Sequence, residues 1–340
     1  MELYLTIGIP VAVVLIFLLL VYMVTDSGPS GNIDLSDPST HVVITGGSSG
    51  IGLATAIMLR QKGCSVTIIA RNEKKLNDAK EEIDSKTPPE KKTKGSLNIV
   101  SADVGNAEQI KTAIQASCEK CGNRVDILIT SAGSSRPGYV EDVDLNMYEQ
   151  MVRINYLGCL YASLAVIPFM KKAGSGRIIF VSSLAGLTSM IGMAGYAASK
   201  FAVRGFAESV QMELKPYNIF VSVVNPPDVD TPMLTEEMQW KPQETKLLSE
   251  DGGLFKAEDI ASDILAAIKT WRFMVNTGLD GWLLGLASPT LSTPCPSIGR
   301  ALVEICMGSI LRLVSLCYLA SWNGVCKTEH EKKTKQLAAS

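Results

Sequence analysis

The sequence contains only two histidines, His41 and His330, and this scarcity argues against several kinds of catalytic site. A Ser-His-Asp hydrolase requires one well-placed imidazole, and a two-histidine zinc site would use both. His41 stands at the start of a predicted strand, whereas His330 lies in a tail rich in lysine and glutamate. We therefore expect chemistry that does not depend on histidine, and we expect no metal site.

An excess charge of one sign is also lacking. The 32 Lys and Arg residues against 34 Asp and Glu residues leave a net charge of −2, so no attraction to nucleic acid is expected.

The eight cysteines include one C-x-x-C pair, Cys118 and Cys121, with no second pair to complete a zinc site. Cys118 falls inside a predicted helix, away from the N-terminus that would lower a redox thiol's pKa. We interpret the thiols as incidental, which fits a reducing compartment.

Apolar residues are plentiful, at 46% of the chain, and their excess lies at the two ends. Residues 3–24 carry no charge and would form a helix of about 33 Å, long enough for a hydrocarbon core of about 30 Å. A cleaved signal peptide is the alternative, but it predicts a basic start and an A-x-A-like exit, whereas Glu2 precedes this segment and residues 25–29 read TDSGP. We expect a membrane anchor over residues 1–25, followed by a flexible linker over residues 26–39. No Lys or Arg flanks the segment, so the positive-inside rule does not orient it.

A second apolar stretch, Ala301–Trp322, contains Glu304 and Arg312. Each charge at the bilayer centre costs about 2.5–3.5 kcal/mol, which favours an interfacial helix or a re-entrant segment over a second span. A C-terminal core helix is the remaining alternative. We expect a membrane-associated segment over residues 276–325, then a solvated polar tail over residues 326–340 whose lysines contact anionic lipid.

Between the two ends, short apolar runs alternate with segments of helical period. Buried strands are predicted at Val42–Gly46, Ser65–Ala70, Leu97–Ser101, Val125–Ser131, Arg177–Ser182 and Ile219–Asn225. Helices are predicted over residues 51–62, 73–84, 106–120, 144–172, 195–215 and 257–270. This alternation is typical of an α/β fold with a doubly wound parallel sheet, here as one Rossmann-type domain over residues 40–275. Residues 84–96 are expected to form a surface loop, and residues 233–250 a mobile lid beyond the sixth strand.

A glycine-rich turn, TGGSSGIG over residues 45–52, follows the first predicted strand and opens the first helix. Glycines at such a turn let backbone N–H groups approach a pyrophosphate, which the helix N-terminus favours. The strand–turn–helix context supports a dinucleotide site, with a purely structural turn as the alternative.

The end of the second strand bears on the choice of nucleotide. An NAD site places a carboxylate there to hold the ribose 2′-hydroxyl, whereas a 2′-phosphate requires a cation. Here Ala70 is followed by Arg71, whose guanidinium forms charge-assisted hydrogen bonds with phosphate. We therefore predict NADPH over NADH, unless Arg71 is simply a surface arginine.

Tyr196 and Lys200 are four residues apart on a predicted helix, so their side chains share one face. A tyrosine with a reference pKa near 10 is a poor acid–base catalyst at neutral pH. An adjacent ammonium favours the phenolate, so we expect Lys200 to lower the pKa of Tyr196. Ser183 follows the fifth strand, where its hydroxyl would bind a carbonyl oxygen, and Asn155 is placed to order a water leading to Lys200.

Taken together, the glycine turn, Asn155, Ser183, Tyr196 and Lys200 resemble the short-chain dehydrogenase/reductase family over about residues 40–275. The resemblance implies that Asn155, Ser183, Tyr196 and Lys200 are catalytic and that Tyr196 and Lys200 also contact the cofactor. It further implies that the cofactor is bound by Thr45, Gly46, Ser48, Ser49, Gly50, Ile51, Gly52, Asp103, Val104 and Thr231. The usual Asn-Asn-Ala-Gly is replaced by TSAG over residues 130–133, which affects an expected sheet-stabilising contact rather than the chemistry.

Within this family the chain resembles most closely the membrane-anchored reductases of long-chain sphingoid ketones. The likeness lies in PPDVDTP over residues 226–232, Glu236-Glu237, the KPxET segment from Lys241, and NYLG over residues 155–158. It implies NADPH-dependent reduction of the 3-keto group of 3-ketosphinganine to sphinganine, at the endoplasmic reticulum membrane with the catalytic domain facing the cytosol.

Two other functions compete with this expectation. Membrane-anchored reductases of steroids or retinoids share the architecture, and the motif residues do not separate one apolar ketone from another. A catalytically silent nucleotide-binding scaffold is a more distant alternative, because all four catalytic positions are intact. The family likeness also implies a homodimer formed by the helices over residues 144–172 and 195–215, although their apolar residues would equally serve to cover the sheet.

Overall fold

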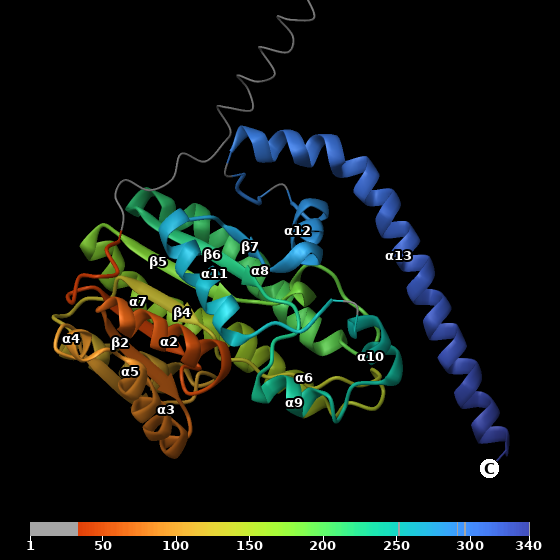
Figure 1. Cartoon of the computed structure of the whole chain (residues 1–340), viewed down its shortest axis with the longest axis horizontal. Coiled ribbons are helices and arrows are strands. Elements are labelled where there is room, and N and C mark those ends of the chain that lie inside the picture. Colours follow the sequence, from red (N-terminus) through yellow and green to blue (C-terminus); the bar gives the residue numbers. More distant parts are fainter. Residues whose placement is uncertain (1–32, 251, 291, 296, 340) are drawn as a thin grey trace, which may run out of the picture.

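A parallel sheet forms the centre of the computed structural model, which describes residues 33–339 except 251, 291 and 296. In this part of the chain seven strands lie in the order β3-β2-β1-β4-β5-β6-β7, and every neighbouring pair is parallel (Figure 1). The strands are His41–Thr45 (β1), Ser65–Ala70 (β2), Leu97–Ser101 (β3), Ile127–Thr130 (β4), Gly176–Val181 (β5), Ile219–Asn225 (β6) and Met274–Asn276 (β7). The six predicted strands are confirmed to within two residues at each end, and β7 was not predicted.

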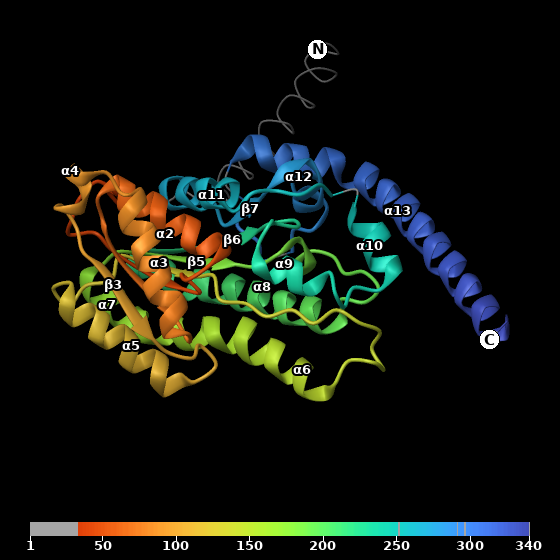
Figure 2. The same ribbon diagram turned by 60° about the horizontal axis from the view of Figure 1, so that its bottom comes forward.

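Helices cover both faces of this sheet, as Figure 2 shows. On one face lie α2 (Gly50–Lys62), α3 (Glu73–Lys86) and α11 (Ala257–Thr270), and on the other lie α5 (Ala107–Lys120), α7 (Gly158–Ala173) and α8 (Ala194–Leu214). Because both faces are covered, central strands such as Ile127–Thr130 are buried along their whole length. The predicted doubly wound α/β architecture is therefore confirmed.

The helix predicted over residues 144–172 is not continuous. It consists of α6 (Leu145–Met151), a π-helical turn over Val152–Leu157 and α7. Such π-helical turns frequently mark functional sites. Here the turn contains Asn155, whose buried side chain accepts a hydrogen bond from Ser134 in the loop after β4. The local change in helical pitch therefore coincides with a contact to a distant part of the chain.

The segments beyond the predicted domain differ in part from expectation. The proposed anchor, residues 1–25, lies outside the described residues. Residues 33–39 were expected in the flexible linker, yet Leu35 is buried against the core and Pro38 accepts a hydrogen bond from Ser65. The surface loop at 84–96 contains a short helix, α4 (Pro89–Lys92), and the expected lid contains α9 (Pro232–Glu237) and α10 (Gln243–Glu250).

The C-terminal part of the chain forms α12 (Gly278–Ala287) and the 42-residue helix α13 (Ile298–Ala339), which extends past the body of the molecule (Figure 1). Many apolar side chains of α13 are exposed, including Ile305, Leu313 and Leu319, so the alternative of a core helix is wrong. Its segment Ile298–Gln336 is long and apolar enough to cross a membrane, and only 6% of an apolar 18-residue stretch within it is buried, against 39% of such a stretch within Leu145–Ala173. The apolar, exposed surface of α13 indicates membrane association.

The tail beyond residue 325 was expected to be separate from the apolar segment, but α13 continues through it without a break. Near its end, Lys333 forms an ion pair with Glu244 of α10 at 3.0 Å and also contacts the Tyr139 hydroxyl. Near its start, Arg300 pairs with Glu304 at 2.6 Å, which offsets one of the charges counted against insertion.

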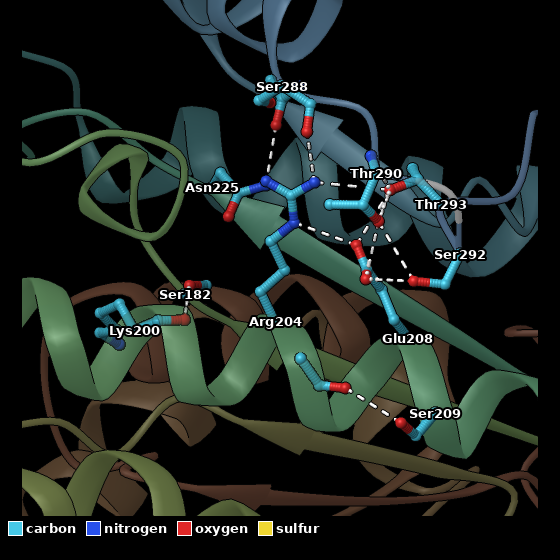
Figure 3. Close-up of polar contacts among 12 residues, drawn as sticks. Ser182, Lys200, Arg204, Glu208, Ser209, Asn225, Ser288, Thr290, Ser292 and Thr293 are labelled. Carbon is cyan, nitrogen blue, oxygen red and sulfur yellow. Dashed lines mark hydrogen bonds and ion pairs between the residues drawn. The ribbon is translucent and has the colours of Figure 1, made fainter.

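A buried ion pair attaches the chain before α13 to helix α8 (Figure 3). Arg204 and Glu208 lie 3.1 Å apart with their side chains 7% and 9% exposed. Arg204 also donates to the Ser288 carbonyl, and Glu208 accepts hydrogen bonds from the hydroxyls of Ser292 and Thr290 at 2.6 and 2.9 Å. The segment leading into α13 is therefore held against the same helix that carries Tyr196 and Lys200.

Candidate active site

A cavity of about 950 Å³ lies at the carboxyl edge of the sheet. Residues that follow β1 to β6 line it, as expected for an open parallel sheet, where ligands bind outside the carboxyl ends of the strands. Its other walls come from α9, α10, α12 and α13. One continuous space therefore extends from the glycine turn to the exposed C-terminal helix.

The glycine turn has a geometry that side chains would block. Gly46 has φ +72°, and a Cβ there would lie 2.5 Å from the Ala132 backbone nitrogen. A Cβ on Gly52 would lie 2.4 Å from the Gly46 carbonyl oxygen. Only glycine allows this close approach of helix and turn, which leaves the start of α2 open to the cavity.

The first turn of α2 is suited to an anionic group. Ser49 caps it with an extended backbone and makes no side-chain capping bond, and the first turn contains no acidic residue. Ser48, Ser49, Gly50 and Ile51 all line the cavity, so the unpaired N–H groups of the helix face a space with room for a pyrophosphate. The residues present therefore fit a dinucleotide cofactor.

The far end of this site carries positive charge. Arg71 is exposed, lines the cavity and makes no ion pair with any residue that the structure describes. Lys75, one turn into α3, lines the same wall and was not predicted. The sequence alone could have predicted this position, because Lys75 lies in the first turn of the helix after β2 and that turn lies beside residue 71.

Not all the expected cofactor residues reach the cavity. Val104 lines it, but the Asp103 carboxylate accepts a hydrogen bond from the Gly105 N–H at 3.0 Å. Thr45 is buried within the end of β1. Thr231 lines the cavity, and its methyl group would lie 3.0 Å from a Cβ on Gly50, so the loop after β6 closes over the glycine turn.

The four proposed catalytic side chains come together at one part of this site. Ser183, Tyr196 and Lys200 line the cavity, and Asn155 lies behind it. Lys200 Nζ donates to the Val181 carbonyl oxygen at 3.0 Å and lies 5.5 Å from the centre of the Tyr196 ring. The strand end, the short turn after it and helix α8 thus bring the three cavity residues together.

The electrostatics of this group differ from the expectation in one respect. Burial raises the pKa of Tyr196, the Glu237 carboxylate raises it further, and a hydrogen bond with Ser183 acts in the opposite direction. The expected net lowering of the Tyr196 pKa is therefore not found, because the cost of burying a phenolate prevails. Burial lowers the pKa of Lys200 itself to about 8.

Asn155 makes direct contacts with protein rather than leaving its amide free to order a water. Its Oδ1 accepts from the Ser134 N–H at 2.8 Å, and its Nδ2 donates to the Ser134 carbonyl at 2.9 Å and to Ser199 Oγ at 2.8 Å. These bonds join the loop after β4 to helix α8. Asn155 therefore positions the two elements that border Tyr196.

A charged group in the wall of the cavity was missed by the sequence analysis. Lys241, buried to 2% exposure at its side chain, lies 2.9 Å from Asp228 and 3.7 Å from Glu237, and all three line the cavity. The residues are separated in sequence and come from the loop after β6, α9 and the chain beyond it. Glu237 and Lys241 stand four residues apart within the expected lid, a spacing that allows an ion pair on a helix, but Asp228 precedes the lid and no local spacing links it to them.

Comparison with known proteins agrees with this geometry. A family model described as short chain dehydrogenase matches residues 40–242. The chain is 40% identical over 321 residues to the 3-ketodihydrosphingosine reductase of Mus musculus, covering 94% of each protein. It is 39% identical over 315 residues to the 3-dehydrosphinganine reductase of Danio rerio, covering 92% of this chain and 93% of the fish protein. It also resembles a crystal structure of actinorhodin polyketide ketoreductase with NADPH, with 26% identity and a TM-score of 0.61 over 67% of this chain and 90% of that one.

Proposed function

The chain belongs to the short-chain dehydrogenase/reductase family, and we propose that it uses NADPH to reduce the 3-keto group of 3-ketosphinganine to sphinganine. The observation that carries this proposal is the 40% identity to a 3-ketodihydrosphingosine reductase over 94% of the chain. The cavity agrees with it, because it begins at the glycine turn, passes Tyr196 and reaches apolar residues of α12 and α13.

In the proposed step, a hydride is added to C3 and a proton to the carbonyl oxygen. When bound, NADPH would supply the hydride. Ser183 and Tyr196 would hold the oxygen, and Tyr196 would donate the proton. The raised pKa of Tyr196 keeps its hydroxyl protonated at neutral pH, as an acid requires. Lys200 would bind the ribose and stabilise the phenolate left after transfer.

The preference for NADPH is supported by charge. Arg71 and Lys75 line the cavity beyond the end of β2, where a 2′-phosphate would lie, and no acidic residue among those that the structure describes lines that wall. A cation pair of this kind favours a phosphate over a bare hydroxyl. The resident cofactor proposed here is therefore NADPH.

The proposed substrate is a lipid, and the C-terminal part of the chain suits its delivery. The cavity is lined by Leu311, Val314 and Tyr318 of α13, and neighbouring side chains of that helix are exposed and apolar. A long alkyl chain could extend along this wall while the ketone lies near Tyr196.

We further propose that the protein resides at the endoplasmic reticulum membrane with its catalytic domain facing the cytosol. We also propose that it forms a homodimer.

The test is NADPH oxidation by the detergent-solubilised full chain, with 3-ketosphinganine compared against a steroid ketone and a retinoid carbonyl. We expect preference for the long-chain amino ketone. Turnover of only the other carbonyls would retain the chemistry and reject the substrate. Binding of NADPH without turnover of any carbonyl would favour the nucleotide-binding scaffold.

A further inference from the structure

The charged group formed by Asp228, Glu237 and Lys241 is not used by the proposed proton transfer, although it lies in the wall of the same cavity. Its two carboxylates share one ammonium. Lys241 Nζ donates a hydrogen bond to Asp228 Oδ2 at 2.9 Å and stands 3.7 Å from Glu237 Oε2, beyond hydrogen-bond distance. The trio therefore carries one negative charge in excess on the substrate side of the cavity.

Glu237 is the member with the incomplete pairing. Its side chain is 9% exposed, and its only ion pair among the described residues is the long one to Lys241. Burial raises the pKa of this carboxyl, while the Lys241 ammonium opposes the rise. A buried carboxylate without a close cation is costly, and an additional cation in the cavity would relieve that cost.

The trio lies close to the reacting group. The charges of Glu237 and Asp228 both act on the Tyr196 hydroxyl, and Glu237 also acts on Lys200. Lys200 is committed to the Val181 carbonyl oxygen and, in the proposed mechanism, to the cofactor ribose. A cation placed next to the oxygen that Tyr196 holds would therefore face Glu237 and Asp228.

The proposed substrate has a cation at that place, because its C2 amine is bonded to the carbon adjacent to the C3 ketone. We propose that Glu237, assisted by Asp228, binds the ammonium group of the amino ketone, with Lys241 holding the two carboxylates in place. The inference rests on the proposed function and extends it, since it assigns the residues that distinguish a 2-amino ketone from an uncharged one.

The experiment compares 3-ketosphinganine with the ketone in which hydrogen replaces its 2-amino group. We expect Glu237→Gln to lower kcat/KM for the amino ketone about 10- to 100-fold, mainly through KM, because it removes a hydrogen bond between charged groups. The loss with the deaminated ketone should be at least tenfold smaller. Asp228→Asn should show the same selectivity to a smaller extent. Asp230→Asn, an exposed neighbour that does not line the cavity, is the matched control and should affect neither ketone.

Equal losses with the two ketones in Glu237→Gln and Asp228→Asn would overturn the inference, because a purely structural role would not depend on the amine. NADPH binding, measured by fluorescence, verifies that each variant retains its cofactor site. If the unaltered protein reduces neither ketone, the proposed function fails and the inference with it. If it reduces both equally well and the variants do not separate them, only the inference fails.

Discussion

We predict that the buried charge of Lys200 lowers the free energy of unfolding of the wild-type protein. An uncharged side chain at this position should therefore make the protein more stable. Burial lowers its pKa from 10.5 to about 8. At 1.36 kcal/mol for each pKa unit, this change costs about 3 kcal/mol of folding free energy at pH 7. Lys200→Met removes that cost and loses one hydrogen bond to Val181, which is worth about 1 kcal/mol. The variant should therefore be about 2 kcal/mol more stable, while losing activity.

The dependence on pH identifies the cause. The folded state disfavours the charged lysine, so between pH 8 and 10.5 the unfolded state binds more protons, and the wild-type protein becomes more stable as the pH rises. The advantage of Lys200→Met should therefore be largest at neutral pH and fall below about 1 kcal/mol at pH 10. In thermal unfolding of the cofactor-free protein, a gain of about 2 kcal/mol corresponds to about 4–8 °C in Tm at pH 7.

Lys111→Met, at an exposed position of α5, is the matched control and should show no such pH dependence. A Lys200→Met variant whose stability difference is the same at pH 7 and pH 10 would refute the reasoning. So would a variant that is less stable than the wild-type protein at pH 7.

Three further predictions concern the catalytic acid, the phosphate site and the buried ion pair. Tyr196→Phe should lower kcat about 10²- to 10⁴-fold and leave the NADPH Kd unchanged in a fluorescence titration, because the acid is lost but the site remains; substantial remaining turnover would contradict its role. Arg71→Ala should raise the KM for NADPH at least tenfold in steady-state assays while sparing NADH, and equal effects on the two would contradict the phosphate assignment. Arg204→Ala should cost about 3–5 kcal/mol in denaturant unfolding, because it leaves Glu208 buried without its cation. Glu208→Ala in the same chain should recover part of that loss, and a single variant as stable as the wild type would show that the pair is not important.

The sequence was sufficient to predict the sheet because its central strands are unbroken runs of apolar, mainly β-branched residues. Strands covered on both faces have this composition, and Ile219–Asn225 was predicted with the correct bounds. The three-residue β7 has only half-buried side chains and therefore shows no such run. The π-helical turn at Asn155 also escaped prediction, since it accompanies hydrogen bonds to Ser134 and Ser199, which are distant in sequence.

The candidate site was predictable where chemistry follows from local spacing. The i, i+4 pair Tyr196 and Lys200 and the glycine turn are of this kind. The direction of the shift in the Tyr196 pKa could not be predicted from the sequence. A helix pattern shows the neighbouring lysine, but it does not show the burial that raises this pKa. Glu237 and Lys241 lie one helical turn apart, yet their exposure to a common cavity depends on how the segment after β6 folds back over the site.

The Arg204–Glu208 pair gives the C-terminal helix a fixed relation to the catalytic residues. A buried pair is a poor source of stability in itself, because two charges must be removed from water. Its effect here is positional: the pair and its hydrogen bonds with Thr290 and Ser292 hold the chain before α13 against α8, one to three turns from Tyr196 and Lys200. Because α13 also lines the cavity, a substrate that leaves the membrane along this helix would reach the tyrosine through a wall whose position is set by the same helix. An apolar pair at these positions would pack there but would lack the directional bonds that fix the segment.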